Sequence, residues 1–132
     1  MAGKLSPQAQ MKVATLQAMA DKVQHVYGLV ERYAATRDPR QAEMLAMPMK
    51  RAFGKLKIEL MGSGLDTLSQ LAGSMEIAAG RGGSQRQKLR VLREGVASLR
   101  FQVEQEQKKV VSEDQAAQRM DEADAPPDRR ND

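Results

Sequence analysis

Basic side chains have the clearest capacity for chemistry in this chain, because they gather in one segment beside an apolar seam. Residues 81–101 carry six Lys and Arg side chains and one acid. Arg86, Arg93 and Arg100 are spaced by seven, and Arg90 lies one turn from both Arg86 and Arg93, so a helix would align the four as a stripe. Such a stripe favours phosphate backbones or acidic protein surfaces. The segment is therefore typical of a binding module.

An apolar seam runs along the same segment. Its residues follow steps of three and four, which keep them on one face of a helix: Leu89, Leu92, Val96, Leu99 and Val103. A helix with this face requires partner helices. One element is thus predicted both to pack and to attract anions.

The basic residues fall into two zones, residues 37–57 and residues 81–100. If the helices predicted over residues 48–80 and 84–111 are antiparallel neighbours, the zones lie near opposite ends of the molecule. That spread suits a long polyanion better than a small phosphate ligand. The candidate nucleic-acid contacts are Arg81, Arg86, Lys88, Arg90, Arg93, Arg100, Lys50, Arg51, Lys55 and Lys57.

Catalytic and metal-binding residues are scarce. The chain has no cysteine, and its one histidine, His25, lies beside an apolar stripe, which favours a boundary or packing role. Glu59 and Glu76 are 17 residues apart, about 25 Å along a helix, so we expect them to be solvated or paired with neighbouring cations. The glycine-rich residues 80–84 lack the Lys-Ser or Lys-Thr of a phosphate-binding loop. We expect no catalytic residue, no metal, no cofactor and no enzymatic activity.

Composition predicts one all-helical domain. The chain has 132 residues, enough for a single modest core, and aromatic residues make up 3% of it with no Trp. Residues 1–111 hold 18 Lys and Arg against 10 acids, whereas residues 112–132 hold 3 against 7. No apolar run approaches the length of a membrane span, and the N-terminus lacks a signal-peptide core. We expect a cytoplasmic protein with no membrane contact.

Helix boundaries can be predicted from caps and prolines. Ser6-Pro7 begins a helix of roughly 29 residues. Asp38-Pro39 begins a short helix that Pro48 is expected to end. Apolar residues then recur every three or four positions over residues 48–80. This continuous spacing favours one long helix bent at residues 61–64 over two helices joined by a tight loop. Interior glycines such as Gly54 and Gly73 would mark close approach of another backbone, or mere tolerance.

The sequence after residue 83 indicates two more helices. Ser84 caps the basic helix, expected over residues 84–111, and Ser112 resembles the start of a short fourth helix that ends near residue 123. The predicted fold is therefore an all-α, up-down helical bundle with three long helices and a short fourth. Residues 1–123 form its single domain, and residues 124–132 are expected to be a disordered acidic, proline-containing tail.

Self-association is the second expectation from the apolar pattern. The helix predicted over residues 48–80 carries a second apolar row, and nine methionines are available to pack adaptably. The row comprises Ile58, Met61, Leu65, Leu68 and Ala72. A three-helix core with a short fourth helix would leave an apolar side uncovered. Homo-oligomer formation is the usual way to bury it.

Three segments resemble a known family. They are residues 48–54 (PMKRAFG), residues 71–80 (LAGSMEIAAG) and the Lys88-Leu89 to Phe101 region with its GVASLRF sequence. These look like the four-helix-bundle accessory variability determinants of diversity-generating retroelements, which share a fold with products of ribosomal RNA intervening sequences. The resemblance covers roughly residues 48–111. Family members usually finish with a full fourth helix, whereas only a short one is predicted here.

The resemblance implies a pentameric, barrel-like assembly whose basic surface binds nucleic acid and a partner reverse transcriptase. It also implies that the stripe arginines and Lys88 contact the polyanion. Sequence and resemblance together predict a non-enzymatic, oligomeric accessory protein that binds RNA or a nucleic-acid enzyme. The alternative is a helical assembly subunit or adaptor, such as a CRISPR effector small subunit or a phage structural protein. A helical chaperone for an acidic client is a third hypothesis.

Overall fold

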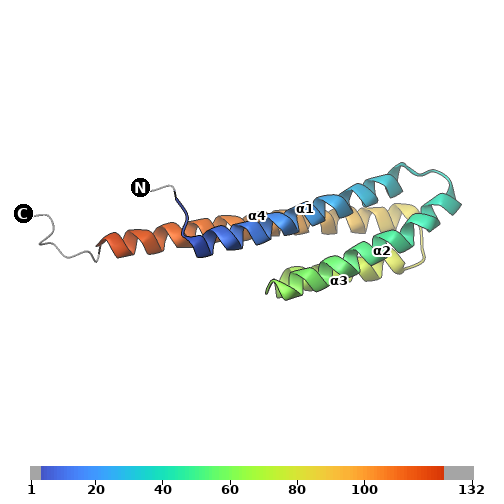
Figure 1. Ribbon diagram of the computed structural model, residues 1–132. Helices are drawn as coiled ribbons and strands as arrows, with labels where there is room; N and C mark the ends of the chain where they lie inside the picture. Colours follow the sequence, from blue (N-terminus) through green and yellow to red (C-terminus); the bar gives the residue numbers. More distant parts are fainter. Residues whose placement is uncertain (1–3, 124–132) are drawn as a thin grey trace, which may run out of the picture.

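The computed structural model describes residues 4–123 as four α-helices joined by short connections (Figure 1). They are α1 (Pro7–Ala35), α2 (Pro39–Gly62), α3 (Asp66–Gly80) and α4 (Gln85–Ala123). The predicted all-helical fold class is confirmed. The predicted tail, residues 124–132, lies outside the described residues, as do residues 1–3.

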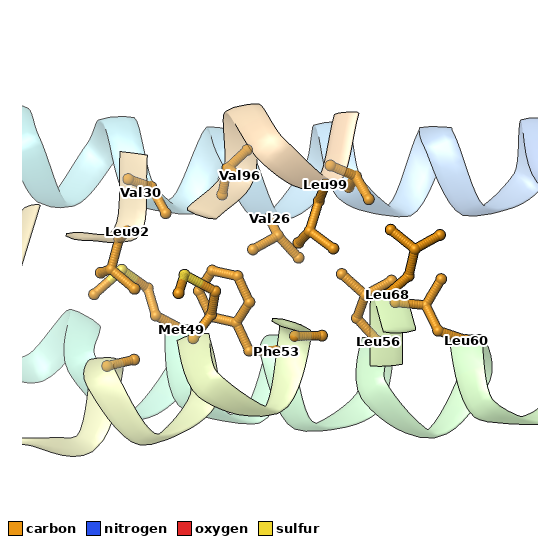
Figure 2. Packing of buried hydrophobic residues seen from close by; sticks show 14 of the residues in the cluster. Val26, Val30, Met49, Phe53, Leu56, Leu60, Leu68, Leu92, Val96 and Leu99 are labelled. Carbon is orange, nitrogen blue, oxygen red and sulfur yellow. The ribbon is translucent and has the colours of Figure 1, made fainter. Parts of the chain in front are cut away.

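The helices form two layers with the core between them. Helices α1 and α4 run side by side in one layer, and α2 and α3 form a hairpin in the other (Figure 1). Figure 2 shows how side chains from both layers meet. The buried set includes Val26, Val30, Leu92, Val96 and Leu99 from the first layer, and Met49, Phe53, Leu56, Leu60 and Leu68 from the second. Of the seam predicted on the basic helix, Leu92, Val96, Leu99 and Val103 are thus buried, and Leu89 is half-buried.

Helix α1 begins and ends as its sequence predicts. The Ser6 hydroxyl accepts a hydrogen bond from the Ala9 N–H at 3.2 Å, and Pro7 occupies the first turn, where no N–H donor is needed. The helix has 29 residues and buries one apolar stripe against the other helices. Periodicity and capping agree here, so the sequence alone locates the helix.

Helix α2 does not end at Pro48, so the prediction of a short helix over residues 39–47 is wrong. Asp38 does cap the helix, because its side chain accepts from the Arg40 N–H at 3.0 Å. Pro48 lies within α2 and removes one backbone donor for the carbonyl of Met44. Both residues are exposed, so water can solvate that carbonyl. The buried Met49 and Phe53 then hold the helix in place.

A turn at residues 63–65 separates α2 from α3, so the prediction of one bent helix is also wrong. The Gly64 N–H donates to the Met61 carbonyl at 3.0 Å, and the Leu65 N–H donates to the Leu60 carbonyl at 2.9 Å. Gly64 has a φ of 77°, in the left-handed region. This is the glycine-centred Schellman termination of a helix. The turn sends α3 back along α2.

Helix α4 is the longest element, with 39 residues, against 29, 24 and 15 for α1, α2 and α3. The predictions of a break at Ser112 and of a short fourth helix are therefore wrong. Residues 96–123 contain neither Gly nor Pro and are rich in strong helix formers. Asp114, within this continuous helix, makes a tertiary contact, since its carboxylate accepts from Ser6 of α1's cap.

Helix α4 is hydrogen-bonded to residues at or near both ends of α1. At one end, the Gln85 side-chain amide donates to the carbonyls of Tyr33 and Thr36, both at 2.9 Å. At the other end, the backbone N–H and the hydroxyl of Ser6 donate to Asp114 at 3.0 and 2.6 Å. These contacts fix the register of the pair along its length.

Glycines at the hairpin admit side chains rather than another backbone. A Cβ on Gly54 would collide with the carboxylate of Glu76, and one on Gly73 would lie 3.1 Å from the Lys57 Cδ. No atom lies within 4 Å of a Cβ placed on Gly62. The glycines at positions 54 and 73 therefore leave room for an ion pair between the hairpin helices.

The left-handed turn predicts that Gly64→Ala destabilises the protein. An L-residue in this conformation costs about 1 to 2 kcal/mol, and urea denaturation would measure the loss. Gly28→Ala is the matched control, because Gly28 is helical, exposed and has nothing within 4 Å of its Cβ position. That substitution should raise the unfolding free energy by about 0.5 to 1 kcal/mol. Equal effects of both substitutions would contradict the role of the turn.

The contact between Ser6 and Asp114 predicts a pH-dependent stability. Hydrogen bonds from the Ser6 hydroxyl and backbone N–H lower the pKa of Asp114. A lowered folded-state pKa stabilises the protein above the unfolded-state pKa, and this stabilisation is lost as pH falls through the folded-state value. The Tm difference between wild type and Asp114→Asn should therefore be largest near neutral pH and shrink in acid. A difference that stays constant with pH would contradict this contact.

Candidate nucleic-acid interface

The two basic zones lie at the same end of the molecule, so the predicted placement at opposite ends is wrong. Because the chain reverses at Gly64, α3 runs back along α2 toward the end of the molecule where α2 begins (Figure 1). The Lys50 side chain packs beside Gly80, with its Cδ 3.1 Å from the position of a Cβ there. Gln85 also joins the α3–α4 connection to the end of α1.

This convergence concentrates positive charge. Residues 31–57 and 76–100, which we call the basic half, hold 13 Lys and Arg against 5 Asp and Glu. The other described residues, 4–30, 58–75 and 101–123, hold 6 Lys and Arg against 9 Asp and Glu. The molecule is therefore electrically polar along its length, and an approaching polyanion would be attracted to the basic half.

Three arginines of the α4 stripe have partners within the protein. The Arg93 guanidinium donates two hydrogen bonds, each 2.9 Å, to the carboxylate of Glu31 on α1. Arg100 lies over the Tyr27 ring, 5.5 Å from its centre, in a cation–π geometry. Arg90 pairs with Glu94 at 3.3 Å on the exposed surface.

Arg86 extends the stripe toward the α3–α4 connection. It is exposed and has no ion-pair partner in the part of the chain that the structure describes. Arg81 and Lys88 line a nearby hollow of about 610 Å³ whose apolar wall includes Ala42 and Ala79. Glu43 also lines this hollow and offsets part of its charge.

The predicted contacts on α2 divide between two sides of the helix. Arg51 and Lys55 line a hollow between α1 and α2, together with His25. Lys50 and Lys57 lie instead along the contact between α2 and α3, beside Gly80 and Gly73. The ten candidate residues therefore share one half of the molecule but not one face.

Glu59 and Glu76 both form ion pairs, which is one of the two alternatives predicted from the sequence. Glu59 pairs with Lys22 at 2.6 Å, and Glu76 pairs with Lys57 at 3.0 Å. His25 is exposed at the edge of the α1–α2 hollow. Within residues 4–123, no group of His, Cys, Asp and Glu side chains is arranged to hold a metal ion.

Arg32 is a candidate contact that the sequence did not single out. It is exposed in the last turn of α1, the helix between the α2 cations and the α4 stripe. A single basic residue near a helix end carries no binding signal by itself. Its relevance comes from α1 packing against both α2 and α4.

The site offers charge and hydrogen-bond donors. Exposed ion pairs contribute only about 0 to 1 kcal/mol each, so a phosphate group can replace a carboxylate partner at small cost. Hydrogen bonds from Arg93 lower the pKa of Glu31, which keeps that carboxylate charged and in competition with an external anion. The arrangement can therefore bind a polyanion through exchangeable contacts.

Comparisons of the chain with protein-family models, curated proteins and solved structures give no match. The likeness to accessory variability determinants therefore stays a prediction. No helix in the described part of the chain is long and apolar enough to cross a membrane.

The pair of Arg93 and Glu31 predicts that Glu31→Gln strengthens binding of inorganic polyphosphate. Removing the carboxylate frees the guanidinium for phosphate, and we expect affinity to rise about two- to fivefold. Titration calorimetry at fixed salt would measure the change. Glu113→Gln adds the same net charge on the remote part of α4 and should change affinity less. Equal gains from both substitutions would show that only net charge matters.

Proposed function

We propose that this chain is a non-enzymatic, nucleic-acid-binding accessory protein that contacts RNA through its basic half. One observation carries the proposal: the turn at Gly64 gathers two basic segments, distant in sequence, at one end of the molecule. An excess of cations on adjoining helices is the electrostatic footprint expected of a polyanion-binding protein.

The length of the stripe favours a chain of phosphates over a single one. Arg86 and Arg100 are 14 residues apart on α4, about 21 Å at helical rise. A single phosphate group is much smaller than this span. Several phosphates of a nucleic-acid backbone could contact the stripe together, and each would contribute to the salt dependence of binding.

Recognition is proposed to depend on charge and shape rather than on base stacking. Of the four aromatic residues, Tyr33 and Phe53 are buried and Tyr27 is half-buried beneath Arg100. Phe101 alone is exposed. Single-strand readers generally stack successive bases on several aromatic side chains, and this surface does not supply such a series.

The family resemblance adds two more specific features to the proposal. They are a reverse transcriptase or other nucleic-acid enzyme as protein partner, and a homo-oligomer built from helical bundles. The presence of four helices, with a full-length α4, supports this likeness. Mass in solution, measured by light scattering, tests the oligomer separately from RNA binding.

A salt titration tests the nucleic-acid proposal. Affinity for a mixed-sequence RNA should fall linearly on a log–log plot as salt rises, with a slope of about 0.7 to 0.9 per phosphate contact. The triple variant Arg32→Gln, Lys55→Gln, Arg86→Gln removes three exposed cations that have no ion-pair partner among residues 4–123. It should weaken binding and reduce the slope by about two to three.

The matched control neutralises three cations outside the basic half: Lys12→Gln, Lys108→Gln, Lys109→Gln. All three are exposed, and the net charge falls by the same amount. This variant should keep a slope close to that of the wild type, with circular dichroism confirming that both variants are folded. A flat salt response of the wild type, or equal losses in both variants, would contradict the proposal.

A further inference from the structure

The outer face of the α2–α3 hairpin carries a concentration of exposed apolar side chains. We call these residues the hairpin row: Met44, Met47, Ile58, Met61 and Ile77, with 53% to 74% of each residue exposed. They account for five of the nine large exposed hydrophobic residues in the described chain. Scattered apolar residues need no explanation, but a concentration on one element indicates an interaction surface.

Helix geometry places the row along one side of the hairpin. Met47 and Ile58 are eleven residues apart, close to three helical turns, so they point in similar directions. Ile77 lies one turn from both Gly73 and Gly80, which pack against Lys57 and Lys50 of α2. Ile77 therefore lies beside the line where the two helices meet.

The structure corrects the apolar row predicted on a continuous helix. Leu68 and Ala72 are buried in the core, and Leu65 is half-buried in the turn. Only Ile58 and Met61 of that set remain exposed, because the chain reverses between them and the other three. On α3, the large apolar residue that remains exposed is Ile77.

Several polar groups along the hairpin contact are already paired, whereas Lys50, beside Gly80, has no ion-pair partner among residues 4–123. Lys57 donates to Glu76 at 3.0 Å, and the buried Ser69 hydroxyl donates to the Lys57 carbonyl at 2.9 Å. Gly54 and Gly73 provide the space for this ion pair. An apolar partner could therefore cover the part of the contact line at Lys57 and Glu76 without leaving a charge unpaired, which is the main cost of burying such groups.

Charge indicates the kind of partner. Lys50 and Arg51 are exposed next to the row and have no ion-pair partner among residues 4–123. A second copy offering the same face would bring like charges together, which disfavours pairing. Acidic groups at the edges of an apolar stripe would instead complement Lys50 and Arg51. Unbranched methionines can adapt to a helix lying along the face.

We propose that the hairpin row binds an acidic amphipathic helix of another protein. The partner's apolar stripe contacts Ile58 and Ile77, and its flanking carboxylates face Lys50 and Arg51. This inference does not require RNA binding, although Lys50 and Arg51 also belong to the basic half, where a bound RNA would compete with the partner's carboxylates for these two cations.

The test uses the full-length protein and a designed helical peptide with a leucine face and glutamates beside it. Fluorescence anisotropy should show binding of this peptide, and Ile58→Ser with Ile77→Ser should weaken it by about tenfold or more. A peptide with lysines in place of the glutamates should bind at least about tenfold more weakly. Absence of binding, or equal binding of both peptides, would overturn the proposal.

A matched double variant and a mass measurement complete the design. Phe101→Ser with Met120→Ser removes two apolar residues of similar exposure, 60% and 67%, against 67% and 59% for Ile58 and Ile77. This control should retain peptide binding, and an equal loss would overturn the proposal. Sedimentation should give the same mass for wild type and Ile58→Ser, Ile77→Ser. A lower mass for the row variant would identify the face as a contact between copies instead.

Discussion

The left-handed turn at Gly64 is the constraint on which the arrangement of this molecule depends. Its hydrogen bonds to the Leu60 and Met61 carbonyls end α2 and direct α3 back along it. The reversal sets the hairpin register in which Lys57 meets Glu76. It also returns the chain to the end where α2 began, so that α4 starts beside the first basic zone. A single backbone conformation thus determines both the core and the distribution of charge.

Helix α4 converts that arrangement into a fixed surface. Its buried seam packs against the hairpin, and hydrogen bonds from Gln85 and to Asp114 hold α1 near both ends. The stripe arginines therefore project from a helix whose position is set on two sides. The contact of Arg100 with the Tyr27 ring then orients a flexible side chain before any ligand arrives, which reduces the entropy lost when a phosphate binds.

The sequence predicts those parts of the fold that depend on local signals. Ser6 and Pro7 locate the start of α1, and the seam of the basic helix identifies the face of α4 that is buried. Two helix boundaries could not be predicted from the sequence. At Pro48, tertiary packing and water compensate for the missing backbone donor, so the helix continues. At Gly64, the spacing of apolar residues continues across the turn and hides the end of the helix. The stripe was visible from spacing, but its partners Glu31 and Tyr27 lie on another helix. Sequence spacing therefore could not reveal which arginines are already engaged.

The basic half and the hairpin row differ in the range of the forces that they exert on a ligand. Charge on the basic half acts over about 8 to 10 Å at moderate salt, so it can draw in a polyanion before contact. The hairpin row acts only at contact, because apolar association requires water to be expelled from the touching surfaces. Paired groups such as Lys57 and Glu76 keep the contact line between α2 and α3 nearly neutral. Salt should therefore weaken contacts with the basic half, including those of carboxylates that face Lys50 and Arg51, and should leave the apolar contacts of the hairpin row little changed.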